Sequence, residues 1–379
     1  MSNLAIGIFY FSIRWVLGSY SITKGVILVS QKVRVLSIDG GGIRGIIPTK
    51  ILMRVEELLQ AYSKNPHAKI GDYFDLIAGT STGGIITALS LCPEQVGSQK
   101  TKYAATDFLN FYLDYAQQIF SRSFMTRYLD RLGLFNPLYR KEPLEELVEK
   151  YLGDYRLSDL TKPCLIPAYD TQSGEAVFFN QLGIVKGSPK DLLVRDIIRA
   201  TTAAPTYFPV ARPNLKNTFI DGGLFANNPA LNAYVEATKF PCEPRQREIL
   251  ILSLGTGAKD IHYPYEQVKS WGRLGWVVPV INIYGSAASQ TVNHQLTRLY
   301  GQKDLAANYL RIEPSLDKFE VDKGMDSVSE QNLQALQKIG EATASEYDEQ
   351  LKLFVKKVYE SHLRCPHENL FRQPRSSKT

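Results

Sequence analysis

The chain has 379 residues, of which 44% are hydrophobic and 22% charged, and this balance excludes a disordered or collagen-like protein. It is long enough for one large α/β domain or two smaller ones. The mean hydropathy of −0.17 argues against a polytopic membrane protein. Four scattered cysteines without a CxxC pair support neither a disulfide framework nor a structural zinc site, and they fit a reducing compartment.

Basic side chains concentrate at the two ends of the sequence. Residues 1–34 carry four basic and no acidic side chains, and residues 364–379 carry four basic and one acidic, so the net charge of +6 leaves the body nearly neutral. A nucleic-acid-binding protein would show a basic face instead, so we expect no nucleic-acid partner. Basic ends fit either an anionic membrane surface or solubilising termini. We expect a cytoplasmic protein and leave peripheral membrane association open.

The N-terminal segment matches no single targeting pattern. Its longest uncharged run, residues 2–13, is shorter than the roughly 20 apolar residues that span a bilayer. No basic residue precedes this run, which argues against a signal peptide, whereas an interfacial anchor and a non-native extension both stay open. We therefore expect an N-terminal extension of unknown role at 1–32, one domain at 33–360 and a basic, flexible tail at 361–379.

The body alternates apolar runs of strand length with helical spacing of apolar residues. The runs predict strands at 34–38, 74–78, 164–169, 218–220, 248–254 and 308–312, and a last long helical stretch from about 329 to 359. Such alternation predicts an α/β fold with a mostly parallel sheet that helices cover on both faces.

Three predicted strands end in glycine-rich turns: residues 39–45 (DGGGIRG), 79–83 (GTSTG) and 221–223 (DGG). Active sites of such folds lie at the carboxyl ends of the strands, so we expect the three turns to meet there. The second turn is a nucleophile elbow, Gly-x-Ser-x-Gly between a strand and an apolar helix, which makes Ser81 the candidate nucleophile.

The glycine run of the first turn fits two functions. Residues 40–45 match the dinucleotide fingerprint, which expects an acidic residue about 20 residues on at the end of a second strand. The acidic residues in that interval, Glu56 and Glu57, lie in a helical pattern instead. Consecutive glycine amides can instead form an oxyanion hole, with the positive charge of Arg44 nearby. A tight turn without chemistry is the third interpretation.

Ser81 needs a group that takes its proton. Of the five histidines, only His294 is a serious candidate for a Ser-His-Asp triad, and it sits in a helical stretch rather than a strand-end turn. Asp221 is better placed, at a predicted strand end before two glycines, and its carboxylate can accept the proton directly. The alternative for Asp221 is a helix cap or turn residue.

An aromatic segment with interleaved arginines runs from residue 103 to 139. It is compatible with a lid or membrane-facing surface that admits acyl chains, and equally with helices that pack their aromatic side chains into the core.

The three turns together resemble the signature blocks of the patatin-like phospholipases, in the same order. Residues 203–209 (AAPTYFP) and 72–75 (DYFD) are also similar to that family, and the resemblance spans roughly residues 33–359. It implies a three-layer α/β/α sandwich with a mostly parallel central sheet. It also implies a catalytic dyad, an oxyanion hole and a set of motif glycines: Ser81 and Asp221; Gly40, Gly41, Gly42 and Arg44; and Gly45, Gly79, Gly83, Gly222 and Gly223.

The activity that the resemblance implies is hydrolysis of acyl esters in phospholipids, lysophospholipids or galactolipids, with neither metal nor cofactor. The partner would be a membrane or micellar lipid substrate. Two alternatives stay open: an effector phospholipase that is silent until a partner or small signal binds, and a Ser-His-Asp esterase that uses His294.

Overall fold

The structure is a computed structural model that describes residues 31–119, 137–182, 184, 190–213, 217–240, 247–258, 262–301, 306–322 and 324–364. The N-terminal extension and basic tail that the sequence predicts lie almost entirely outside these ranges. Strand β1 (Gln31–Ile38) begins and helix α14 (Asp348–Arg364) ends the described part, so regular structure extends slightly beyond the expected limits of 33 and 360.

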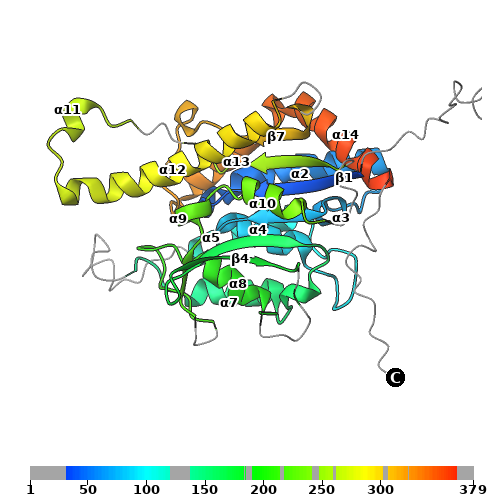
Figure 1. The fold of residues 1–379 in the computed structure, drawn as a ribbon, viewed down its shortest axis with the longest axis horizontal. Helices are drawn as coiled ribbons and strands as arrows, with labels where there is room; N and C mark the ends of the chain where they lie inside the picture. Colours follow the sequence, from blue (N-terminus) through cyan, green and yellow to red (C-terminus); the bar gives the residue numbers. More distant parts are fainter. Residues whose placement is uncertain are drawn as a thin grey trace, which may run out of the picture.

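A mixed sheet with mostly parallel strands forms the centre of the fold, in the order β4–β3–β2–β1–β6–β7 (Figure 1). Strands β3 (Cys164–Asp170), β2 (Leu76–Gly79), β1, β6 (Arg247–Leu254) and β7 (Tyr309–Ile312) are parallel, and β4 (Glu175–Asn180) forms an antiparallel hairpin with β3. The α/β fold with a mostly parallel sheet is therefore confirmed.

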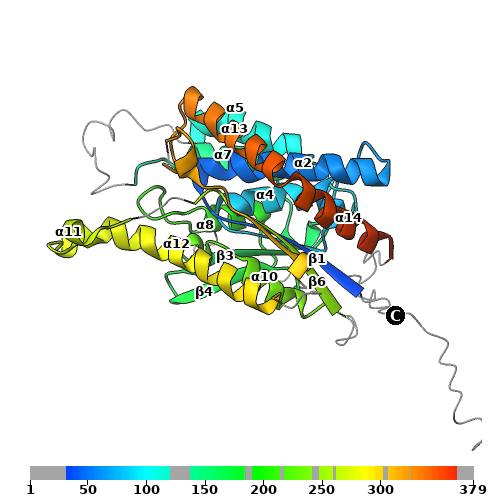
Figure 2. The same ribbon diagram turned by 90° about the horizontal axis from the view of Figure 1, so that it is seen from above.

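The two faces of the sheet carry separate apolar cores, as alternation of side chains along a strand requires. On β1, Val33 and Val35 belong to one core, and Leu36 and Ile38 belong to the other. The larger core contains side chains of α2 (Ile46–Ser63), α4 (Thr82–Leu91), α5 (Ala105–Ile119), α7 (Glu142–Leu152), α8 (Val194–Thr201), α13 (Glu330–Glu346) and α14. The smaller core contains side chains of α10 (Ala230–Ala237) and α12 (Arg273–Leu299). Figure 2 shows α2 and α13 on one side of the sheet and α10 and α12 on the other, which makes three layers.

The register between β1 and β2 sets the first two turns side by side. Ile38, the last residue of β1, is paired with Gly79, the last residue of β2. A buried ion pair fixes the other end of this strand pair, where the Arg34 backbone amide and side-chain Nε both donate to Asp75 at 2.8 Å. The short helix α3 (Ile70–Tyr73) leads into that position. The segment 72–75 thus has a structural role in aligning β2.

Strand β5 (Phe219–Asp221) ends at the same edge of the sheet, but it runs in the opposite direction to the one that the sequence predicts. It pairs antiparallel with β3, with Ala168 opposite Asp221, so the expectation that its end is the carboxyl end of a parallel strand is wrong. Strand β4 pairs with one side of β3, so β2 and β5 both pair with the other side. Strand β2 pairs with Cys164 and Leu165 of β3, and β5 pairs with residues further along β3. Strands β2 and β5 therefore run toward one another, and their ends meet.

The aromatic segment is a core element where the structure describes it. Phe108, Phe111 and Tyr112 of α5 are all buried in the larger core. This confirms core packing for these side chains, and residues 120–136 of the segment lie outside the described part. No helix in the described ranges is both long enough and apolar enough to cross a membrane.

Candidate active site

Ser81 occupies a strained turn between β2 and α4. Its φ of 53° and ψ of −117° lie in a region that residues with a side chain rarely adopt. Such strain persists only where the surroundings enforce it, and it is concentrated at functional sites. The conformation is the one a nucleophile elbow needs, because it exposes the serine side chain at the end of the sheet.

Close backbone contacts on both sides of the turn require glycine. A Cβ atom on Gly79 would lie 2.0 Å from the carbonyl oxygen of Gly83, and one on Gly83 would lie 2.2 Å from the carbonyl oxygen of Ile38. The first turn of α4 therefore passes directly over the ends of β1 and β2. The two motif glycines allow this approach, and the approach produces the sharp turn at Ser81.

Hydrogen bonds fix the rest of the elbow. The Ser81 amide donates to Thr201 Oγ1 at 3.0 Å, and the Thr201 hydroxyl donates to the carbonyl oxygen of Pro167 in β3 at 2.6 Å. Thr80 Oγ1 donates to the carbonyl oxygen of Ala226 at 2.6 Å. The turn at Ser81 is thus anchored to β3 and to the segment that follows Asp221.

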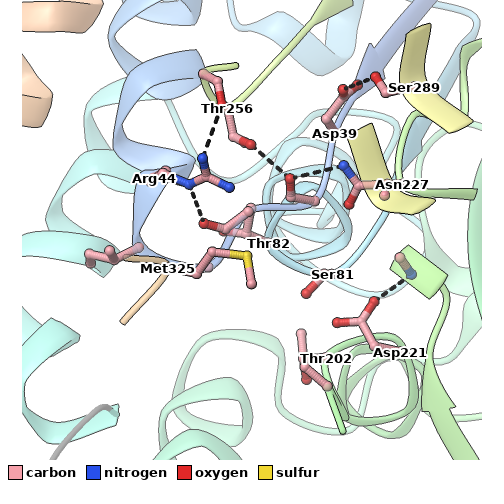
Figure 3. Close-up of a pocket in the computed structure, with 18 of the residues that line it drawn as sticks. Asp39, Arg44, Ser81, Thr82, Thr202, Asp221, Asn227, Thr256, Ser289 and Met325 are labelled. Atoms are coloured by element: carbon pink, nitrogen blue, oxygen red, sulfur yellow. Dashed lines mark hydrogen bonds between the residues drawn. The ribbon is translucent and has the colours of Figure 1, made fainter. Parts of the chain in front are cut away.

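Asp221 faces the Ser81 hydroxyl, as Figure 3 shows. Its backbone amide donates to the carbonyl oxygen of Ala203 at 3.0 Å, and its Oδ1 accepts from the Gly223 amide at 2.7 Å. Gly222 is needed here, because a Cβ atom would lie 2.3 Å from the carbonyl oxygen of Pro167. The carboxylate is therefore held in one orientation.

The pKa of Asp221 is raised from 3.8 to about 6. Burial of the carboxylate is the main cause, and interactions with the Ser81 hydroxyl and the Gly223 amide partly oppose it. A carboxylate with this pKa is a stronger base than an ordinary aspartate and is still ionised at neutral pH. These are the properties that a base for a serine hydroxyl requires.

The glycine run at residues 40–42 lies beside the elbow, and its amides differ from one another. The Gly40 amide donates to the carbonyl oxygen of Asn227 at 3.0 Å, while its own carbonyl oxygen accepts from Thr256 Oγ1 at 2.7 Å. The amides of Gly41 and Gly42, in contrast, have no hydrogen-bond acceptor within the described residues, and both glycines line the cavity. Gly40 is therefore an anchor of the loop, and the available donors are Gly41 and Gly42.

The loop has room for no side chain at these positions. A Cβ atom on Gly41 would lie 2.2 Å from Thr256 Oγ1, and one on Gly42 would lie 2.2 Å from the carbonyl oxygen of Met325. Gly42 also has a φ of +60°, which favours glycine.

The Arg44 side chain holds this loop through hydrogen bonds to backbone carbonyl oxygens. Its Nε donates to the carbonyl oxygen of Gly41 at 3.4 Å, and one terminal nitrogen donates to the carbonyl oxygen of Gly257 at 3.0 Å. The side chain is buried. Gly45 allows the end of this loop to lie close to the start of α4, because a Cβ atom on Gly45 would lie 2.4 Å from Thr82 Oγ1.

A buried ionic network anchors the start of the loop, and the sequence analysis did not find it. Arg311 of β7 donates to both carboxylate oxygens of Asp39, at 2.8 and 2.6 Å, and also contacts Glu313. Glu313 in turn accepts from the Gly257 amide at 2.8 Å, and Ser289 of α12 donates to Asp39 at 3.3 Å. Burial alone would lower the pKa of Arg311, but the charges of Asp39 and Glu313 outweigh it and raise that pKa.

The network connects to the glycine loop through backbone atoms. Gly257 donates its amide to Glu313 and accepts from Arg44 at its carbonyl oxygen, and Arg44 also donates to Gly41. The signal in the sequence was a charged residue within an otherwise apolar strand, Arg311, but its partner Asp39 lies 272 positions away. We interpret Arg311 and Glu313 as positioning residues for the glycine loop.

A cavity of about 640 Å³ opens at this edge of the sheet. Ser81, Asp221 and the glycine loop lie in its wall. Much of the remaining wall is apolar, with contributions from α4, α5, α7, α12 and the segments around residues 208 and 224: Ile85, Phe111, Leu144, Phe208, Leu224 and Val280. The structure thus brings all of the predicted catalytic and oxyanion residues to one cavity.

The residues of the two competing hypotheses, His294 and Glu56, are not among those that line the cavity. His294 is an exposed residue of α12 and is not among the residues that line the cavity. Glu56 lies inside α2 and accepts hydrogen bonds from the Ile70 amide at 3.1 Å and the Ala105 amide at 3.0 Å. It therefore anchors the starts of two other helices and is not placed at a strand end to bind a ribose.

Comparisons with known proteins identify the family of the chain. A family model described as "Patatin-like phospholipase" matches residues 36–234. The chain is 35% identical over 338 residues to "Patatin-like protein 2" of Arabidopsis thaliana, covering 82% of each chain. It is 33% identical over 342 residues to "Patatin-like protein 2" of Oryza sativa subsp. indica, covering 82% of this chain and 83% of the rice protein. The chain belongs to the patatin-like phospholipase family, and this membership supports a lipid acyl hydrolase.

One solved structure gives a more distant likeness. VipD from Legionella pneumophila is 13% identical, with a TM-score of 0.41, over 88% of this chain and 67% of that chain.

Proposed function

We propose that this protein is a serine acyl hydrolase that cleaves fatty-acyl ester bonds of phospholipids, lysophospholipids or galactolipids through a Ser81–Asp221 dyad. The observation that carries the proposal is the meeting of Ser81, in its strained elbow, with the buried Asp221 carboxylate at one cavity. The apolar wall of that cavity is suited to an acyl chain.

The residues suggest a two-step reaction. Asp221 accepts the proton of the Ser81 hydroxyl while the oxygen attacks the ester carbonyl carbon. The alcohol or lysolipid leaves with that proton, and an acyl-serine ester remains. Water then attacks the acyl carbonyl, Asp221 accepts a proton from the water, and the fatty acid leaves as Ser81 regains its proton.

The developing oxyanion needs donors that are already in place. The Gly41 and Gly42 amides meet this need because they line the cavity and have no acceptor elsewhere in the described residues. Arg44 fixes the loop through two carbonyl oxygens, at distances of 3.4 and 3.0 Å. We therefore assign Gly41 and Gly42 as oxyanion donors, with Gly40 and Arg44 as the groups that position them.

The test is direct measurement of fatty-acid release from defined phospholipid, lysophospholipid and galactolipid by the purified protein, with Ser81→Ala as control. We expect release from at least one lipid class by the native protein and none by the variant. Equal release by Ser81→Ala would contradict the proposal. Activity that appears only after addition of cell extract would assign the chain to the regulated effector class.

A further inference from the structure

Helix α12 carries an exposed apolar stripe. Within the described residues, its first half has four large hydrophobic side chains that face solvent at 37, 51, 38 and 55% exposure: Trp276, Val280, Ile283 and Tyr284. Their spacing of four, three and one residues places them on one face of the helix. Figures 1 and 2 show that this half of α12, with the short helix α11 (Tyr265–Val268), projects beyond the sheet rather than packing on it.

The stripe is continuous with the catalytic cavity. Val280 and Tyr284 are exposed to solvent and also line the cavity that contains Ser81. Further along the same helix, Gly285, Ser286 and Ser289 line the cavity as well. One side of α12 thus leads from open solvent to the wall of the active site.

The charge of this region is suited to a lipid surface. Helix α12 contains no acidic residue, and its only charged side chains are Arg273 and Arg298, near its two ends. Before it, Glu266 of α11 is paired with Lys269. A bilayer surface that contains anionic phospholipid repels exposed carboxylates and attracts basic side chains.

Aromatic side chains mark the projecting end. The rings of Tyr263 and Trp271 lie 5.3 Å apart, and those of Trp271 and Trp276 lie 5.2 Å apart, both in edge-to-face arrangements. Tyr and Trp have an apolar body with a polar atom, and they are enriched where protein meets the headgroup region of a bilayer. Interfacial helices combine such residues with basic side chains, as this one does.

We propose that the apolar stripe of α12 (Trp276, Val280, Ile283 and Tyr284) docks on the surface of a phospholipid bilayer and delivers its lipids to the cavity. The lipid-delivery part rests on the proposed function, whereas docking itself can be measured without catalysis. The helix would lie in the interface, because it is not apolar enough to cross the membrane.

The experiment measures binding of the full chain to phosphatidylcholine vesicles, with and without phosphatidylglycerol, in a Ser81→Ala background so that no lipid is hydrolysed. The test variant is Trp276→Ser with Ile283→Ser, since neither residue lines the cavity. The matched control is Leu353→Ser on α14, which removes a side chain of 67% exposure from another helix. We expect the test variant to lose about tenfold in vesicle partitioning and the control to lose less than about twofold.

A second readout uses fluorescence. Of the three tryptophans, Trp271 and Trp276 lie in this region, so a Trp15→Phe chain reports on it alone. We expect a blue shift on addition of vesicles and quenching by lipids brominated on the acyl chain.

Three outcomes would overturn the docking proposal. The first is absence of vesicle binding by the parent chain, and the second is binding that the α12 substitutions do not weaken. The third is concentration-dependent self-association, seen by light scattering and lost in the α12 variant, which would assign the stripe to a second copy of the chain. If docking behaves as expected but the chain with Ser81 restored hydrolyses no lipid, the surface stands and the proposed function fails.

Discussion

The glycine loop and the first half of α12 border the same cavity, and they are built in opposite ways. The loop is buried, and side chains or backbone groups of Asn227, Thr256, Arg44 and the Asp39–Arg311 pair hold it in place. The stripe on α12 exposes Val280 and Tyr284 to solvent, and its projecting end lies away from the sheet. The two proposals account for this difference: donors to an oxyanion need fixed positions, whereas a surface that docks on lipid needs apolar exposure.

The largest expected effect comes from the dyad itself. Ser81→Ala and Asp221→Asn should each lower kcat for ester hydrolysis by at least about 10³-fold, because one removes the nucleophile and the other its base. Ester hydrolysis assays measure this loss, and thermal unfolding checks that each variant still unfolds cooperatively. A folded variant of either kind with substantial turnover would contradict the dyad.

Breaking the buried ionic network should cost folding stability as well as activity. Arg311→Ala leaves the buried Asp39 and the partly exposed Glu313 without their cation, and we expect a loss of about 3–5 kcal/mol in the free energy of unfolding. The control Arg54→Ala removes a partly exposed ion pair with Asp348 and should cost less than about 1 kcal/mol. Denaturant unfolding measures the free energy of unfolding of both variants. Equal losses would show that the ionic network at the glycine loop contributes no more to stability than a surface ion pair does.

The raised pKa of Asp221 predicts two pH effects of opposite sign. Activity requires the ionised carboxylate, so kcat/KM should fall about tenfold per pH unit below about pH 6. Stability behaves in the reverse way, because the folded protein holds this proton more tightly than the unfolded chain does. Ionisation of Asp221 therefore lowers the free energy of unfolding as the pH rises from about 4 to above 6.

Asp221→Asn separates these effects. The amide cannot ionise but can still accept from the Gly223 amide, so the variant should be more stable than the native chain by about 3 kcal/mol above pH 7. Near pH 4 the difference should vanish. Two results together would show that Asp221 is not the buried base. The first is a native kcat/KM that falls only below about pH 4, and the second is a free energy of unfolding of Asp221→Asn that equals that of the native chain at every pH.

The smallest expected effect is that of His294→Ala. The side chain is exposed on α12 and outside the cavity lining, so kcat/KM should change by less than about twofold on a soluble ester. Steady-state kinetics test this. A loss as large as that of Ser81→Ala would favour the Ser-His-Asp hypothesis.

The sequence predicts local features of the site well and distant pairings poorly. The elbow at Ser81 and the glycine run can be predicted because a sharp turn and close backbone approach restrict the residues at those positions. The direction of β5 cannot, since a three-residue apolar run has the same pattern in parallel and antiparallel pairing. The Asp39–Arg311 pair depends on the order of strands in the sheet, which no local pattern contains.

The most direct test of the central claim is labelling with a fluorophosphonate probe, which reacts with an activated serine whatever its substrate. We would compare the native chain with Ser81→Ala, Asp221→Asn and His294→Ala. The dyad predicts strong labelling of the native chain and of His294→Ala. It predicts no labelling of Ser81→Ala or Asp221→Asn. Labelling that persists in Ser81→Ala, or in Asp221→Asn at the native rate, would contradict it.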